Sequence, residues 1–474
     1  MQAPHKLAVA PATAPTMRPC LPGRLAAPHA HFQPRIIMNR PIALAALLLA
    51  SVLATVRPAS AAEQPRTMDE ALAAARERKS PVLLDFHAPW CYSCYYMASH
   101  VLTGPDWESV KARAVVMELD ADAPEGAQWM KKLHVRALPS YVVLSADGTE
   151  LGRILAEQTR PQFYGQIDAI LAGNDSLEAL QTKAAGGDVA SVAAVLAAYH
   201  ARYQASEGLQ WFASLPAALR DQAADEPAVS LRLDRLQLLR AATASDVDGC
   251  VDAGQKVLAA DLGCDRPYEL DRLMSCTEKM PTEARRALLA GQRPALERML
   301  SQRIFVATPS CADQRSAVFA AADLYDALGD AGAKADVLDR AIALTEKTID
   351  GDVARDRNLA DNLRVYMTAA ERTDSLDALM PKLIAAYPDD YVYAYRYGRS
   401  LLERGKPEAA LPYLEQAAAK AYGANRLTVA SYRVKALKAL NRPADARRVV
   451  AETLAANGPW FPEEAAKLKA QLQS

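Results

Sequence analysis

The sequence predicts an α/β domain followed by a long all-α region. The α/β domain is indicated by two apolar runs typical of buried strands, Val82–Leu84 and Tyr141–Leu144, with a turn at Asp147-Gly148 after the second. The all-α region is indicated by composition, because glycine accounts for only 21 of 474 residues and aromatic residues for 6%. Beyond about residue 175, apolar residues recur at helical spacing and strand signals are nearly absent.

The N-terminal 61 residues have the features of an export signal. Residues 1–37 show no period, so we expect a disordered extension or one upstream of the true start codon. Residues 38–61 begin with the short basic stretch Met38-Asn39-Arg40, continue with the apolar run Ile42–Val56 and end in small residues that suit cleavage. We therefore expect a signal peptide and an exported, periplasmic protein. An uncleaved anchor is the alternative, although the run is short of the ~20 residues of a spanning helix. No later stretch is apolar enough to span a membrane.

Two cysteines, Cys91 and Cys94, follow the first predicted strand and are separated by two residues. This spacing lets both lie in the first turn of a helix, where free N–H groups and the helix dipole lower a thiol pKa. Cys91 is therefore the candidate nucleophile and Cys94 the candidate resolving thiol. A zinc site is the alternative reading. Zinc needs four ligands and no second ligand pair lies nearby, so we predict no metal.

The residues around this pair resemble the thioredoxin superfamily, from about residue 67 to residue 171. Asp85 lies six positions before the first cysteine, where the family keeps a buried carboxylate, and Trp90 directly precedes that cysteine. Leu138 and Pro139 occupy the place of the family's cis-proline loop. The segment most resembles periplasmic reductase-type members, including the C-terminal domain of the membrane thiol:disulfide interchange protein.

The resemblance implies a fold, a site and a set of partners. The fold is a central mixed sheet flanked by helices, here residues 62–172. Asp85 would take the proton of the resolving thiol, while Trp90, Leu138 and Pro139 would bind the client. The protein would reduce or exchange disulfides in client proteins, with the redox-active disulfide as its only redox group and no separate cofactor. An upstream redox partner protein would reduce the pair again, since no flavin or nicotinamide motif is present.

Four positions depart from the family pattern. The dipeptide Tyr92-Ser93 differs from that of the cytoplasmic reductases and of the strong oxidants, and Glu118 and Ala156 replace a lysine and a glycine. The direction of electron flow and the preferred client therefore stay open. Nucleic acid is a poor partner, because the formal net charge is −1 and the chain has no basic block.

The all-α region divides into residues 173–385 and residues 386–474. The second part resembles tetratricopeptide repeats, since Gly405 and Ala410 fall at suitable spacings and Ala410 recurs as Ala446, 36 residues on (446 − 410). Stacked helix pairs leave a concave surface that can hold a partner. An irregular helical array packed on the redox domain is the alternative. A second hypothesis makes the array the main function, as a scaffold or chaperone-like binding protein in which the redox domain is secondary.

Four further cysteines lie in the all-α region, and their even number suits an exported chain. A helix over Val251–Leu262 would separate its flanks by roughly 18 Å, whereas bridged Cα atoms lie within about 7 Å. A pair of Cys250 with Cys264 is thus disfavoured. If the next helix runs back along the first, Cys276 comes beside Cys250. A third helix over Pro281–Gln302 would then carry Cys311 toward Cys264. We therefore predict two structural bridges, with free buried thiols as the alternative. These bridges are Cys250–Cys276 and Cys264–Cys311.

Overall fold

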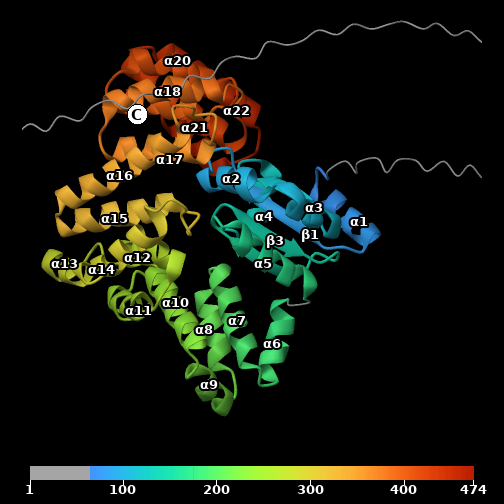
Figure 1. Ribbon diagram of the computed structural model, residues 1–474. Coiled ribbons are helices and arrows are strands. Elements are labelled where there is room, and N and C mark those ends of the chain that lie inside the picture. The colour runs from blue at the N-terminus through green and yellow to red at the C-terminus, as the bar shows by residue number, and fades with distance from the viewer. Residues whose placement is uncertain (1–64, 174–175, 474) are drawn as a thin grey trace, which may run out of the picture. The chain divides into compact units, whose positions relative to one another are not determined.

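The computed structural model describes residues 65–173 and 176–473, and Figure 1 shows their helices and strands. The expected signal peptide and the extension before it, residues 1–61, lie outside the described residues. Within the described ranges every strand lies before residue 156, which confirms an α/β domain followed by an all-α region. The α/β part consists of α1 Met68–Arg78, β1 Val82–His87, α2 Tyr92–Tyr96, the π-helical turn η1 Met97–Val101, α3 Gly104–Arg113, β2 Val115–Asp120, α4 Pro124–Lys132, β3 Ser140–Leu144, β4 Glu150–Leu155 and α5 Arg160–Ala172.

The all-α part follows directly. It consists of α6 Leu177–Ala185, α7 Val189–Ala201, α8 Ala205–Ala213, α9 Ala217–Ala224, α10 Pro227–Ala244, α11 Val247–Ala259, the 3₁₀ turn η2 Gly263–Asp265, α12 Arg266–Cys276, α13 Thr282–Ala290, α14 Arg293–Met299, the π-helical turn η3 Leu300–Ile304, α15 Gln314–Leu328, α16 Ala331–Ile349, α17 Arg357–Ala369, α18 Thr373–Ala386, α19 Val392–Glu403, α20 Pro407–Ala418, α21 Gly423–Ala439, α22 Pro443–Asn457 and α23 Pro462–Ala470.

The four strands form one mixed sheet in the order β2-β1-β3-β4. β1 runs parallel to β2, and β3 is antiparallel to both β1 and β4. The predicted turn at Asp147-Gly148 joins β3 to β4, with Gly148 at a φ of 90°. Residues Val82 to Phe86 of β1 are all buried, as a central strand covered on both faces requires. This strand ends just before the two cysteines and so fixes their position.

Helices cover both faces of the sheet. On one face, α1 and α4 pack against Val82, Leu84 and Phe86 of β1. On the other face, η1, α3 and α5 pack against Leu83 of β1 and Val143 of β3. Alternate residues of the same strand thus enter different cores, as the pleat of a strand dictates.

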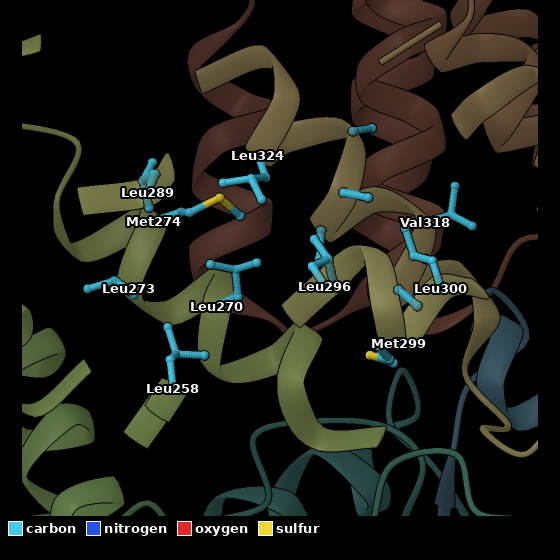
Figure 2. Packing of buried hydrophobic residues seen from close by; sticks show 14 of the residues in the cluster. Leu258, Leu270, Leu273, Met274, Leu289, Leu296, Met299, Leu300, Val318 and Leu324 are labelled. Carbon is cyan, nitrogen blue, oxygen red and sulfur yellow. The ribbon is translucent and has the colours of Figure 1, made fainter. Parts of the chain in front are cut away.

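The all-α part is built from helices that pack against their neighbours in the chain. Such pairs include α6 with α7, α10 with α11, α15 with α16, α19 with α20, and α21 with α22. Figure 2 shows one of their cores, in which the labelled leucine, methionine and valine side chains come from α11 to α15. In the C-terminal pairs, Gly398 lets α19 approach α20, since a Cβ there would lie 2.8 Å from Leu414.

Two helix boundaries differ from those expected. The helix expected to begin at Val251 begins at Val247, because the Asp246 side chain accepts a hydrogen bond from the backbone N–H of Gly249 and caps it. The single helix expected over Pro281–Gln302 is instead divided into α13, α14 and η3. Pro294 lies in the first turn of α14, where its missing N–H costs no helical hydrogen bond.

Two disulfides join parts of the all-α region. The structure pairs Cys250 with Cys276 and Cys264 with Cys311, with Cα–Cα distances of 6.3 and 5.4 Å. These are the pairs expected from the sequence, although Cys250 lies inside α11 rather than before it. Each bridge has one cysteine at an end of α12, so this helix is fixed at both ends.

Candidate active site

Cys91 and Cys94 form a disulfide at the start of α2, with their Cα atoms 5.2 Å apart. Cys91 is the N-cap residue, and its Sγ accepts a hydrogen bond from the backbone N–H of Cys94 at 3.1 Å. The same N–H group would stabilise a thiolate on Cys91 after reduction. The geometry therefore suits the predicted roles of Cys91 as nucleophile and Cys94 as resolving thiol.

The proline loop lies beside this helix end. The Leu138–Pro139 bond is cis, as the resemblance implies. The Ser140 hydroxyl donates to the carbonyl of Ala137 at 2.7 Å, and the N–H of Ala156 donates to the carbonyl of Pro139 at 3.0 Å. These bonds hold the loop at the start of β3 and at the end of β4.

Asp85 lies in β1, six positions before Cys91 in the sequence, and is 9% exposed. In the sheet register it is opposite Glu118 of β2 and Tyr141 of β3. Burial, and then the negative charge of Glu118, raise the pKa of Asp85 from 3.8 to about 7. A carboxyl group with this pKa can accept and return a proton near neutral pH, which is the chemistry expected of it.

A second buried carboxyl group, which the sequence reasoning missed, follows β4. Glu157 is buried and comes directly after Ala156, whose φ is 61°. Burial, and then the negative charge of Asp313, raise its pKa well above its ordinary value. The available signal in the sequence was that Ala156 occupies a position where the thioredoxin family has glycine. Glycine readily adopts the left-handed backbone that Ala156 has here, so this position marks a sharp turn of the chain.

The active-site helix is covered by helices from the all-α part. The Tyr92 hydroxyl donates to Asp313 at 3.3 Å, and the Arg315 guanidinium lies 3.5 Å from the centre of the Tyr92 ring. Two backbone carbonyls are also engaged: Asn358 donates to that of Tyr92 at 2.9 Å, and Arg396 to that of Trp90 at 3.0 Å. The hydroxyl and the ring of Tyr92, the residue after the candidate nucleophile, are therefore held by residues of the all-α part.

One consequence is that Cys91 is only 4% exposed. Cys94 is more exposed than Cys91, so the order of burial is the reverse of what an exposed attacking thiol would need. Trp90 is 40% exposed, and its indole N–H donates to Asp122 at 2.7 Å. A folded client protein can therefore contact only a small part of the Cys91 side chain directly.

The covering helices are held by a buried charged network. Asp361 of α17 is 0% exposed and pairs with Arg315 at 2.7 Å, Arg364 at 2.9 Å and Arg396 at 2.5 Å. Burial alone would raise the pKa of Asp361, but the three guanidinium groups outweigh it and hold the pKa far below its usual range. Because Arg315 and Arg396 also contact Tyr92 and Trp90, this network connects three helices to the active-site helix.

The C-terminal helices contact the loop after β2. The backbone N–H of Ala424 donates to the carbonyl of Asp122 at 3.2 Å, and the Tyr422 hydroxyl donates to the Asp120 carboxylate. Gly423 has a φ of 51°, and a Cβ there would lie 1.8 Å from the carbonyl oxygen of Asp122. Only glycine fits this contact.

Replacing Gly423 by alanine should therefore release the C-terminal helices from this loop. We expect faster amide hydrogen exchange in residues 120–124 and at the start of α21, measured by mass spectrometry. Gly405→Ala is the matched control, since Gly405 has a φ of 71° but a Cβ on it would meet nothing within 4 Å. It carries the backbone strain of about 1–2 kcal/mol without the clash, so residues 120–124 should be unaffected. Equal exchange in the two variants would contradict the expectation.

Residues 65–173 and 176–473 contain neither a metal-ligand cluster nor a spanning helix. In these residues no group of three or more histidine, cysteine, aspartate or glutamate side chains could hold a metal ion. Nor does any helix in the same ranges have the length and apolar character needed to cross a membrane.

The sheet, the cysteine pair and the cis proline define a thioredoxin-like domain, and residues 68–170 match the family model of that description. Similar proteins include the thiol:disulfide interchange protein DsbD 1 of Pseudomonas aeruginosa, 49% identical over 107 residues, which are 22% of this chain and 17% of that protein. DsbD of Cronobacter sakazakii is 31% identical over 100 residues, 20% of this chain and 17% of its own. The thiol:disulfide interchange protein TxlA of Synechococcus elongatus is 28% identical over 147 residues, 29% of this chain and 73% of its own.

The chain covers only a small part of the DsbD proteins. The chain spans only 17% of the length of the Cronobacter sakazakii protein and 18% of the related DsbD of Klebsiella pneumoniae. Among solved structures, a thioredoxin from Thermus thermophilus is 29% identical, covering 22% of this chain and 83% of its own, with a TM-score of 0.21.

Proposed function

We propose that the protein is an exported thiol-disulfide oxidoreductase that reduces or exchanges disulfides in client proteins. The observation that carries this proposal is the Cys91–Cys94 disulfide at a helix start, in a domain that also contains the buried Asp85 and the cis Pro139. The similarity of this domain to thiol:disulfide interchange proteins supports the same chemistry.

The reaction has two exchange steps. In the reducing direction the Cys91 thiolate attacks one sulfur of a client disulfide, and the other client sulfur leaves with the electron pair as a thiolate. Cys94 then gives its proton to Asp85 and attacks the Cys91 sulfur, which releases the client as a dithiol. The pair is left oxidised, so an upstream redox partner protein supplies the next two electrons. Run backwards, the same steps oxidise a client.

The remaining parts of the proposal concern recognition and location. We assign client contact to Trp90, Leu138 and Pro139, and partner recognition to the helices, of which residues 386–474 form tetratricopeptide-like repeats. We propose no cofactor besides the redox-active disulfide. Residues 38–61 would act as the signal peptide and place the protein in the periplasm, where the Cys250–Cys276 and Cys264–Cys311 bridges would persist.

The test is the reduction potential of the Cys91–Cys94 pair, measured by equilibration with glutathione or dithiothreitol followed by thiol trapping. We expect a reversible two-electron couple. A potential near about −270 mV would make the protein a reductase, and one near about −120 mV a disulfide donor. The Cys91→Ser, Cys94→Ser variant is the control and should show no couple. Absence of a reversible couple in the unaltered protein would overturn the proposal and leave the helical scaffold as the function.

A further inference from the structure

Two backbone carbonyls beside the nucleophile accept hydrogen bonds from the all-α part. The carbonyl of Trp90, the residue before Cys91, accepts from Nη2 of Arg396 at 3.0 Å. The carbonyl of Tyr92, the residue after it, accepts from Nδ2 of Asn358 at 2.9 Å. A donor on the carbonyl end of a peptide group polarises the N–H at its other end. Both contacts therefore add to the positive end of the helix dipole, where a thiolate on Cys91 would lie.

The Arg396 guanidinium belongs to the buried network around Asp361, which has an excess of positive charge. Asp361 pairs with Arg396, Arg315 and Arg364. Three guanidinium groups and one carboxylate leave two positive charges in excess, and arginine stays charged in folded proteins. These four side chains are at most 20% exposed, so water and salt screen their charge poorly. Arg315 brings part of this charge to within 3.5 Å of the centre of the Tyr92 ring.

Acidic groups of the same region do not cancel this excess. Burial raises the pKa of Glu157 well above its ordinary value and that of Asp85 to about 7, so below these values each holds a proton and carries no charge. The Asp313 carboxylate accepts hydrogen bonds from the hydroxyls of Tyr92 and Tyr268, at 3.3 and 2.8 Å, and contributes one negative charge. Further charged side chains that contact α2 belong to ion pairs, which are Arg357 with Asp390 and His100 with Asp356.

We propose that Arg396 and Arg315 are positioning residues of the redox pair, whose fixed positive charge stabilises the Cys91 thiolate and makes the Cys91–Cys94 disulfide easier to reduce. This inference rests on the proposed oxidoreductase function and assigns part of its redox potential to the all-α part. In the reduction, two glutathione thiols give two electrons to the protein disulfide and become one glutathione disulfide. Of their two protons, Cys94 keeps one and the solvent receives the other, because Cys91 is left as a thiolate.

The first test is the equilibrium of the pair with glutathione at pH 8 in the Arg396→Met variant, which keeps the length of the side chain and removes its charge. A nearby opposite charge changes the proton affinity of a group by about tenfold or more. We therefore expect the equilibrium constant for reduction to fall about tenfold, which corresponds to about 30 mV.

Two variants of the same network serve as controls. Arg364→Met also removes a guanidinium group from Asp361, but among the described residues the hydrogen bonds of the Arg364 side chain go to Asp361 alone. It should change the constant by about threefold at most, because its charge is not in contact with α2. Arg396→Lys keeps the positive charge and should leave the constant within about threefold of that of the unaltered protein.

The second test is the pH profile of Cys91 alkylation by iodoacetamide. In a Cys20→Ser, Cys94→Ser background Cys91 is the one free thiol, because the other four cysteines are bridged. The midpoint of the profile should rise by about one pH unit in Arg396→Met and stay in place in Arg364→Met. The midpoint reports proton binding, whereas the rate itself also depends on access to the sulfur. Arg315→Met replaces Arg396→Met if that variant fails to fold, as judged by circular dichroism.

The outcomes separate this inference from the proposed function. An unchanged constant in Arg396→Met, an equal fall in Arg364→Met, or an equal fall in Arg396→Lys would overturn the inference while the redox function stands. If neither the unaltered protein nor any variant shows a reversible couple with glutathione, the proposed function itself fails.

Discussion

Replacing Asp361 by alanine is expected to destabilise the protein by about 3–5 kcal/mol. The substitution leaves Arg315, Arg364 and Arg396 without the carboxylate that all three share at a site that is 0% exposed. Removing one member of a buried charged group costs this much because the remaining charges stay desolvated and unpaired. The unfolding free energy from urea denaturation, and hydrogen exchange in α15, α17 and α19, would measure the effect.

An exposed ion pair offers the matched control. Asp339 accepts two hydrogen bonds from Arg372, at 2.8 and 3.0 Å, and both side chains are about half exposed. Asp339→Ala should cost less than about 1 kcal/mol. Asp361→Ala should also speed alkylation of reduced Cys91, because Arg315 and Arg396 lose the carboxylate with which they pair. Asp339→Ala should leave the alkylation rate unchanged. Similar losses of stability in the two variants would mean that the buried network contributes nothing beyond a surface pair.

The pH dependence of the Asp361 network follows from the direction in which folding shifts the pKa of Asp361. Its pKa in the folded protein is lowered, so the stabilising charge is fully present above the unfolded value of about 3.9. Stability from this group is lost only as pH falls below that value. Near neutral pH the network should therefore be insensitive to pH.

Replacing Asp85 by asparagine should have the opposite effect and stabilise the thioredoxin-like domain above pH 7. Because folding raises the pKa of Asp85 from 3.8 to about 7, the folded protein binds the proton more tightly than the unfolded chain. The contribution of the Asp85 side chain to the stability of the folded protein is most favourable below pH 4, declines as pH rises toward 7 and is then constant. At 1.36 kcal/mol per pKa unit the full cost of the charged form is about 4 kcal/mol, which the neutral amide avoids.

This prediction is checked by hydrogen exchange of the β1 and β3 amides between pH 5 and pH 8.5. Protection in Asp85→Asn, corrected for intrinsic exchange, should exceed that of the unaltered protein by a margin that grows with pH. Resolution of a mixed disulfide by Cys94 should slow at the same time, since the proton acceptor is gone. Glu118→Gln is the control and should give a smaller gain, because the charge of Glu118 is the second cause after burial. A loss of stability that is the same at every pH would contradict the assignment.

The redox centre was largely predictable because its signals are local. Cys91, Cys94 and Asp85 lie within ten residues of each other, and a strand followed by a helix start fixes their geometry. The bridges within the all-α part depend on short helical connections and could also be argued from spacing. Errors in helix bounds came from local signals that were not used, the cap at Asp246 and the proline at position 294.

The cover over the active site was not predictable in the same way. Arg315, Asn358 and Arg396 contact residues 90–92 across more than 220 positions of sequence. No periodicity or spacing relates one helix to a particular site so far away, and each of these side chains alone is typical of a solvated helix face. The available signal was the density of charged and amide groups at the start of α17, which is unusual for a helix whose residues are mostly buried.

The two bridges at the ends of α12 have a consequence for how the all-α part responds to the redox state of its surroundings. Cys264 and Cys276 fix the ends of this helix to segments outside the redox domain. Their closed loops span 47 and 26 positions, long enough that each restrains the chain by about 3–4 kcal/mol. Neither bridge involves Cys91 or Cys94, so α12 should keep its position through the exchange steps at the redox pair. Only a reducing compartment, in which the two bridges open, would loosen this part of the chain.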